Sequence, residues 1–237
     1  MWIEDYKLIA HRGLHDNATA APENSLPAFE RALARGVGVE LDVHITLDGE
    51  LVVLHDRALK RMTGADGLVE DWTWEELRSL RLLGTDCRIP RLGEVLALLD
   101  GQVPMILEIK NDCKPNLGRL ESRLMEMLAR YPGKLILESF NPSVVAWLRQ
   151  HAPRYVRGQL ACANPDWEKQ LYVKHLMFNP VTAPQFIAYD IDEIDWRLRL
   201  ACNRHGIPLL GWTVKTPEQL DKARRLCDGI IYEGLEL

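Results

Sequence analysis

The stretch Val39-Glu40-Leu41-Asp42-Val43 sets two carboxylates into a run that is otherwise apolar, and Met105-Ile106-Leu107-Glu108-Ile109-Lys110 repeats this arrangement with opposite charges. Residues two apart in a strand face the same side of a sheet. Each run therefore predicts a buried strand that presents ionisable side chains on one face.

Similar apolar runs recur along the chain, and amphipathic stretches with helical spacing separate most of them. This alternation is typical of α/β proteins with parallel sheets. We expect strands at residues 7–11, 37–43, 51–55, 104–109, 134–139, 156–160, 186–190, 208–214 and 229–232. We expect helices at 25–35, 74–82, 92–99, 117–131, 142–151, 194–205 and 217–226.

The length of 237 residues and the lack of a linker or repeat favour one domain over residues 1–237, built as a (β/α)8 TIM barrel. Nine strands are one more than such a barrel needs. The interval 43–51 is too short for a helical crossover, and Asp48-Gly49 is a hairpin turn signal. Two topologies stay open: a tight hairpin that pairs Asp42 with His55, or two parallel strands whose ends lie side by side.

The charge balance of 29 basic against 34 acidic residues gives a net charge of -5, which supplies no basic field for nucleic acid. No apolar run approaches the roughly 20 residues that span a bilayer, and the first residues are acidic. Five cysteines without a C-x-x-C pair disfavour disulfides and a cysteine zinc site. These features predict a soluble, cytoplasmic protein with no nucleic-acid partner and no integral membrane segment.

The carboxylates at the strand ends require a compensating charge. Burying Glu40, Asp42 and Glu108 together would cost several kcal/mol in an apolar interior. One divalent cation, Mg²⁺ or Ca²⁺, is the simplest compensation because both prefer oxygen ligands. The alternative is a salt-bridge cluster in which Arg12 and Lys110 supply the neutralising charges.

Two histidines also end predicted strands. Imidazole titrates near neutral pH, so His11 and His55 can serve as a general acid and a general base. A single histidine at a strand end is more often structural, but these two accompany the carboxylates. Of the other histidines, His15 and His44 flank the candidate site in sequence, and His151, His175 and His205 fall near predicted helix ends or in loops. We expect structural roles for these five.

A cation, an acid, a base and the fixed charges of Arg12 and Lys110 together suit a phosphate ester. They predict hydrolysis, or intramolecular transfer, at phosphorus. The sequence contains no nucleophile elbow, Walker loop or Gly-x-Gly-x-x-Gly element, which disfavours acyl transfer, nucleotide hydrolysis and dinucleotide binding. A catalytically silent barrel that binds a phosphorylated ligand and a sugar isomerase are weaker alternatives.

These segments resemble, in order and spacing, the glycerophosphodiester phosphodiesterases. The resemblance runs from about residue 7 to residue 233 and is most specific in the first half. The segments that carry it are His11-Arg12-Gly13, Pro22-Glu23-Asn24-Ser25, Glu40-Leu41-Asp42-Val43, His55-Asp56, Ile89-Pro90-Arg91-Leu92-Gly93-Glu94-Val95-Leu96, Glu108-Ile109-Lys110 and Gly211-Trp212-Thr213-Val214.

The resemblance implies a barrel of the phospholipase C-like phosphodiesterase type that cleaves glycerophosphodiesters into glycerol 3-phosphate and an alcohol. It implies a catalytic pair and a metal-ligand set, with phosphate contacts and supporting residues around them, and residues 57–88 as an insertion over the barrel mouth. The catalytic pair is His11 and His55, the metal ligands are Glu40, Asp42 and Glu108, the phosphate contacts are Arg12 and Lys110, Trp212 lines the substrate cleft, and Glu23, Asn24 and Asp56 support the site.

Two departures from the family pattern lie where the enzyme would contact the alcohol or the glycerol of its substrate. Lys215 replaces an asparagine, and Glu233 stands where many members carry Thr-Asp-x-Pro. The headgroup therefore stays open, and a lysophospholipase D-like enzyme remains an alternative if Trp72, Trp74 and Leu83 form an apolar mouth. The sequence also leaves open whether water attacks the phosphorus directly or a cyclic phosphate forms first.

Overall fold

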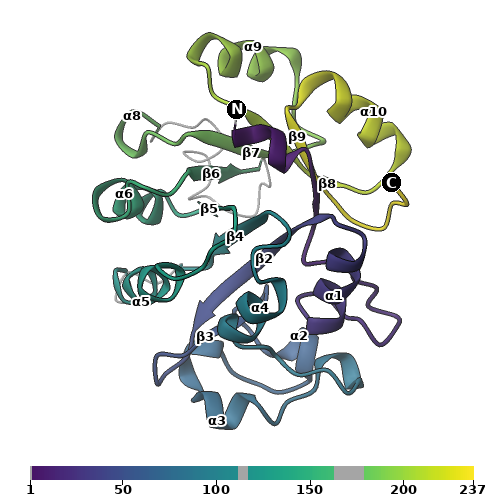
Figure 1. The fold of residues 1–237 in the computed structure, drawn as a ribbon, viewed down its shortest axis with the longest axis vertical. Coiled ribbons are helices and arrows are strands. Elements are labelled where there is room, and N and C mark those ends of the chain that lie inside the picture. The colour runs from purple at the N-terminus through teal and green to yellow at the C-terminus, as the bar shows by residue number, and fades with distance from the viewer. Residues whose placement is uncertain (1, 112–116, 163–178) are drawn as a thin grey trace.

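The computed structural model describes residues 2–111, 117–162 and 179–237. Eight parallel strands form a closed barrel, because β1 pairs with both β9 and β2 (Figure 1). This confirms the predicted TIM barrel. The barrel strands are β1 (Leu8–Ala10), β2 (Gly38–Ile45), β4 (Met105–Ile109), β5 (Leu135–Ser139), β6 (Arg157–Ala161), β7 (Phe186–Asp190), β8 (Leu209–Val214) and β9 (Gly229–Tyr232).

The amino-terminal half of the barrel interior is filled by aliphatic and aromatic side chains, one or two from most strands. They form a buried cluster with Ile3 and Tyr6 of the short 3-10 helix η1 (Trp2–Tyr6). Gly158 of β6 leaves room for the ring of Phe186, since a Cβ at that position would lie 2.2 Å from the ring. The apolar packing ends at the level where the strand carboxylates begin.

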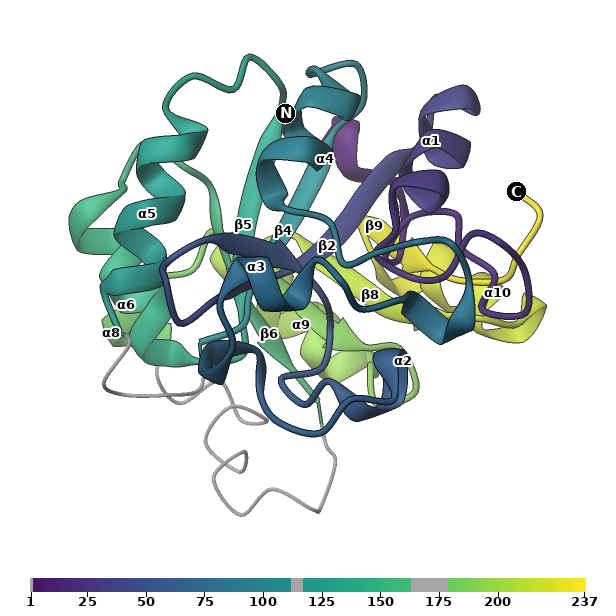
Figure 2. The ribbon, with the colours of Figure 1, turned by 90° about the horizontal axis from the view of Figure 1, so that it is seen from below.

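Helices cover the outside of the barrel, and their apolar faces pack against the outward side chains of the strands. Figure 2 shows α1, α4 and α5 lying along β2, β4 and β5. Helix α1 starts where predicted, since the side chain of Ser25 accepts a hydrogen bond from the N–H of Ala28. The outer helices are α1 (Leu26–Ala34), α4 (Leu92–Leu99), α5 (Arg119–Leu128), α6 (Pro142–His151), α8 (Asn179–Thr182), α9 (Trp196–His205) and α10 (Pro217–Leu226).

The interval after β2 is a hairpin, which resolves the two topologies left open by the sequence. Strand β3 (Leu51–Val53) pairs antiparallel with β2, with Val43 opposite Val53. The expected pairing of Asp42 with His55 is wrong by one residue, because the N–H of Leu54 donates to the carbonyl of Asp42. The loop holds three residues rather than two, and it closes at Gly49 with a φ of 90°.

Residues 57–88 contain four short helices: α2 (Lys60–Thr63), η2 (Val69–Asp71), α3 (Trp74–Leu77) and η3 (Leu82–Gly84). They gather with β3 at one end of the molecule (Figure 1) around a separate apolar cluster. The helix expected at 74–82 is shorter than predicted, because α3 ends at Leu77 and Leu83 adopts a φ of 51°. Trp72 and Trp74 are partly buried and pack against this cluster, whereas Leu83 is 39% exposed.

In the described part of the chain, no helix is both long and apolar enough to cross a membrane.

Candidate active site

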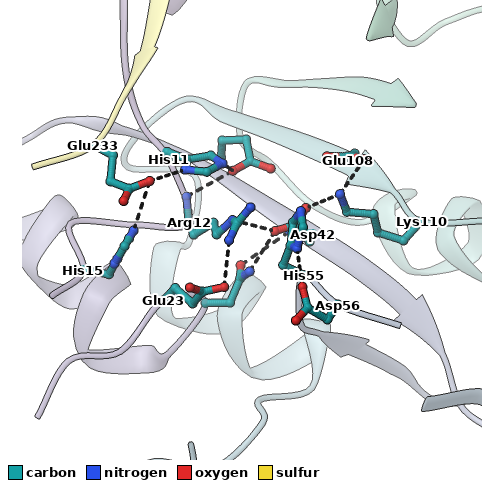
Figure 3. A network of polar contacts seen from close by, with 12 residues as sticks. His11, Arg12, His15, Glu23, Asp42, His55, Asp56, Glu108, Lys110 and Glu233 are labelled. Carbon is teal, nitrogen blue, oxygen red and sulfur yellow. Dashed lines mark hydrogen bonds and ion pairs between the residues drawn. The ribbon is translucent and has the colours of Figure 1, made fainter. Parts of the chain in front are cut away.

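Three carboxylates meet inside the barrel at the carboxyl ends of β2 and β4. The strand register sets Asp42 beside Glu108, and Glu40 lies two residues earlier on the same face of β2. All three are at most 7% exposed, and one oxygen from each lies within 4.8 Å of the others. This geometry confirms the sequence prediction that the three side chains converge. Figure 3 shows two of them, Asp42 and Glu108, on either side of the Lys110 ammonium.

Lys110 and Asn24 hold two of these carboxylates in place. The ammonium of Lys110 lies 3.0 Å from Oδ1 of Asp42 and 2.7 Å from Oε1 of Glu108. The side-chain amide of Asn24 donates to Oδ2 of Asp42 at 2.8 Å. Both oxygens of Asp42 thus have a partner, which fixes the orientation of its carboxylate.

The turn after β1 brings Arg12 to the third carboxylate. Arg12 adopts a φ of 54°, which is uncommon for a residue with a side chain, and its main-chain N–H donates to Oε2 of Glu40 at 3.0 Å. Its guanidinium donates to Glu23 at 2.8 Å and lies 3.5 Å from Asp42. One residue therefore links the end of β1 to both carboxylates of β2.

Burial and mutual repulsion oppose full ionisation of this cluster. Burial, together with Asp42 and Glu108, raises the pKa of Glu40 well above its ordinary value. Burial also raises the pKa of Glu108 to about 7, against the opposing effect of Lys110. For Asp42 burial is outweighed by Lys110, His55 and Arg12, which hold its pKa well below the usual range.

A divalent cation fits this set of residues. Oε1 of Glu40 is buried and has no hydrogen-bond partner among the described residues, which leaves an acceptor available inside the cluster. Oxygen ligands from three carboxylates are the donor set that Mg²⁺ and Ca²⁺ prefer. A cation there would also offset the repulsion that raises the pKa values of Glu40 and Glu108.

The two candidate catalytic histidines, His11 and His55, come from separate motifs and lie beside the carboxylates. Nδ1 of His11 lies 2.9 Å from Oε2 of Glu233, and its Nε2 lies 4.0 Å from Oε2 of Glu40. Burial lowers the pKa of His11 to about 4, despite the hydrogen bond to Glu233. Nδ1 of His55 lies 2.7 Å from Oδ1 of Asp56, and its side chain is 33% exposed.

Arg61 is a site residue that the sequence analysis missed. Its guanidinium donates two hydrogen bonds to Glu23, at 2.9 and 2.7 Å, and it also contacts Asp56. Arg61 lies in α2, so this contact joins residues 57–88 to the Glu23 and Asp56 motifs. No sequence pattern marks it, because a lysine- and arginine-rich helix surface looks the same without such a contact.

Glu138 of β5 is a second residue that was missed. It lies beside Glu108 in the strand register, is 1% exposed, and its Oε2 has no hydrogen-bond partner among the described residues. Burial, followed by repulsion from Glu108, raises the pKa of Glu138 well above its ordinary value. Its position at the end of the apolar run 134–139 is the same signal that identified Glu108.

Trp212 lies on the far side of this region, on β8. Its ring meets Phe140 edge to face with centroids 5.5 Å apart, and the ammonium of Lys110 lies 6.0 Å from the Phe140 ring centroid. Lys110 therefore connects this aromatic pair to Asp42 and Glu108. His175, for which the sequence predicted a structural role, lies outside the described residues.

The profile of the Glycerophosphoryl diester phosphodiesterase family matches residues 11–237, nearly the whole chain. The chain belongs to this family. A glycerophosphodiester phosphodiesterase of Caldanaerobacter subterraneus subsp. tengcongensis is 33% identical over 97% of this chain and 94% of its own length.

Solved structures agree with the fold of this phosphodiesterase. A glycerophosphodiester phosphodiesterase from Thermotoga maritima superposes with a TM-score of 0.74 and 26% identity, over 96% of this chain and 94% of the other. A phosphodiesterase from Oleispira antarctica, solved with the product sn-glycerol-3-phosphate, superposes with a TM-score of 0.82 and 23% identity over 96% and 92%. The recognition made from the motifs is confirmed.

The two departures from the family pattern contact each other in this phosphodiesterase. Nζ of Lys215 lies 3.1 Å from Oε2 of Glu233, the oxygen that also faces His11. The hydrogen bond from His11, the ring of His15 at 3.8 Å and the ammonium of Lys215 at 3.1 Å together hold the pKa of Glu233 far below its usual range. The two residues that depart from the family pattern are therefore connected to the candidate catalytic residue His11, through Glu233.

Proposed function

We propose that this phosphodiesterase hydrolyses glycerophosphodiesters to glycerol 3-phosphate and an alcohol, with one divalent cation and a pair of histidines. The observation that carries the proposal is the buried cluster of Glu40, Asp42 and Glu108, with His11 Nε2 facing it 4.0 Å from Glu40. The Caldanaerobacter relative is a glycerophosphodiester phosphodiesterase, and the Oleispira phosphodiesterase was solved with sn-glycerol-3-phosphate bound. Both findings support the same substrate class.

Glu40, Asp42 and Glu108 are the residues that would hold Mg²⁺ or Ca²⁺. When bound, the cation supplies positive charge to the non-bridging oxygens of the phosphate. Arg12 and Lys110 provide fixed positive charge on the same side of the barrel. Both are held by carboxylates, with Arg12 on Glu23 and Lys110 on Asp42 and Glu108, so little reorganisation is needed when a substrate binds.

The histidines supply the proton transfers. One imidazole removes a proton from the attacking hydroxyl or water as the new P–O bond forms, and the other donates a proton to the alkoxide as the old P–O bond breaks. Glu233 and Asp56 contact Nδ1 of His11 and His55 respectively, which leaves Nε2 of each ring as the atom that exchanges the proton.

The test is release of glycerol 3-phosphate from glycerophosphocholine and glycerophosphoethanolamine, measured with EDTA and after add-back of Mg²⁺ or Ca²⁺. We expect release that EDTA abolishes and one of the cations restores. Phosphorus NMR during turnover then distinguishes direct hydrolysis from a cyclic phosphate. Undiminished release in EDTA, or none with any cation, would contradict the proposal.

A further inference from the structure

A second group of metal-binding side chains lies beside the carboxylate cluster. One ligand atom from each of His11, His15 and Glu233 lies within 4.8 Å of the others. Oε2 of Glu233 lies 2.9 Å from Nδ1 of His11 and 3.8 Å from Nε2 of His15 (Figure 3). Two ligand atoms about 2.05 Å from a tetrahedral zinc ion lie about 3.3 Å apart, so the observed separations fall on either side of that distance.

A second observation, independent of these distances, also indicates a ligand at this group, and it concerns the ring of His15. Its side chain is only 7% exposed, and both of its ring nitrogens are buried without a hydrogen-bond partner among the described residues. A buried imidazole with neither nitrogen satisfied is costly. Figure 3 shows the ring directed at the carboxylate of Glu233. A ligand that takes up the lone pair of Nε2 would remove the part of this cost that belongs to Nε2.

We propose that His11, His15 and Glu233 bind Zn²⁺, at a site separate from the carboxylate cluster. Two imidazole nitrogens and one carboxylate form a donor set that zinc uses with water in the fourth position. The three carboxylates of Glu40, Asp42 and Glu108 instead suit a hard cation with oxygen ligands. The two groups therefore differ in the ion that each selects.

The zinc site has a route to solvent from outside the barrel. A cavity of about 430 Å³ between α1 and the segment after β9 is lined by His15, Glu233, Arg35 and Leu235, among others. An ion can reach Glu233 by this route without crossing the carboxylate cluster. Lys215 competes for the same oxygen at 3.1 Å, but its side chain is 53% exposed and can move into solvent.

Zinc at this site would inhibit the enzyme, a consequence that rests on the proposed function. A metal on Nδ1 of His11 leaves the ring's single proton on Nε2. The ring then has no lone pair with which to act as a base, and loss of the Nε2 proton would leave an unfavourable imidazolate. Both roles open to His11 are blocked, so inhibition follows whether it acts as acid or base.

The test measures zinc binding directly, by competition with a chromophoric zinc chelator in saturating Mg²⁺. The wild type is compared with His15→Ala, with His15→Gln, which better preserves volume, and with His205→Ala as a remote, exposed control. We expect at least a tenfold weaker zinc affinity in both His15 variants and no change in the control. Lys215→Gln is expected to tighten binding, because it removes the competing ammonium.

Activity is then measured with and without zinc, each variant serving as its own reference. The zinc concentration for half inhibition should rise in the His15 variants in parallel with the dissociation constant. Unchanged zinc affinity in both folded His15 variants, or loss of zinc binding in saturating Mg²⁺, would overturn the site. Binding that depends on His15 in a protein without phosphodiesterase activity would instead overturn the proposed function and leave the site intact.

Discussion

Glu233 accepts a hydrogen bond from His11 across the closure of the barrel, with Oε2 lying 2.9 Å from Nδ1 and 222 positions of sequence between them. The contact exists because β1 pairs with β9, which sets the two ends of the chain side by side. A carboxylate at Nδ1 fixes the proton there and leaves Nε2 directed at Glu40. The residue that follows the last strand thereby determines the tautomer of a histidine in the first motif.

Replacing Glu233 with glutamine should therefore impair the chemical step more than substrate binding. We expect Glu233→Gln to lower kcat by about 10- to 100-fold, by analogy with the loss of a hydrogen-bond partner of a metal-bound histidine, with a smaller change in KM. Steady-state kinetics on a glycerophosphodiester measure this. The exposed carboxylate Glu218 serves as the control through Glu218→Gln. An equal kcat for Glu233→Gln and wild type would refute the orienting role.

Each of the two histidines should be required for proton transfer. We expect His11→Ala and His55→Ala to lose at least about 100-fold in kcat while unfolding at nearly the wild-type denaturant concentration. Glycerol 3-phosphate release and urea unfolding are measured on the same preparations. A fully active His11→Ala protein would remove this residue from the mechanism.

Arg61 should contribute to stability because it satisfies a buried carboxylate. Glu23 is 3% exposed and accepts two hydrogen bonds from Arg61, which is itself 44% exposed. After allowing for that exposure, we expect Arg61→Ala to lower the free energy of unfolding by about 1–2 kcal/mol. The matched control is Arg78→Ala, whose surface pair with Glu75 should be worth less than about 0.5 kcal/mol. Equal losses in urea unfolding would contradict the assignment.

Glu138 should destabilise the metal-free protein, and increasingly so as the pH rises. Its folded-state pKa is raised well above the ordinary value, so above that ordinary value the folded state retains a proton that the unfolded chain has lost. Stability at this site therefore falls with rising pH. We expect Glu138→Gln to stabilise the EDTA-treated protein by at least about 1 kcal/mol more at pH 8 than at pH 5.

Urea unfolding at the two pH values measures the difference, with the exposed Glu126→Gln as control. A stabilisation by Glu138→Gln that is the same at both pH values would show that the carboxylate is not held protonated by its surroundings.

The sequence predicts the barrel and the carboxylate cluster well because both depend on strand periodicity. Glu40, Asp42 and Glu108 could be placed together from the rule that alternate residues share a face and that parallel strands end at one edge. The same rule applied to residues 134–139 would have added Glu138. Glu138 is less conspicuous than Glu40, Asp42 and Glu108 because no second charged residue lies two positions away from it in its strand.

Contacts made by loops and by chain closure could not be predicted in this way. The hairpin register depends on whether the turn holds two or three residues, and one residue decides whether Asp42 faces Leu54 or His55. Arg61 reaches Glu23 from a four-residue helix. The pairing of Lys215 with Glu233 joins two positions that the sequence singled out only as separate departures.

Calorimetric titration of Mg²⁺ or Ca²⁺ into chelator-treated protein tests the central claim, that Glu40, Asp42 and Glu108 hold the cation used in catalysis. We predict one cation per chain and loss of binding in Glu40→Gln. Binding should tighten between pH 6 and 8, because burial raises the pKa of Glu108 to about 7 and the cation requires its ionised form. Glycerol 3-phosphate release should follow the same saturation curve. Binding by Glu40→Gln equal to that of wild type, or activity that does not follow occupancy, would contradict the account.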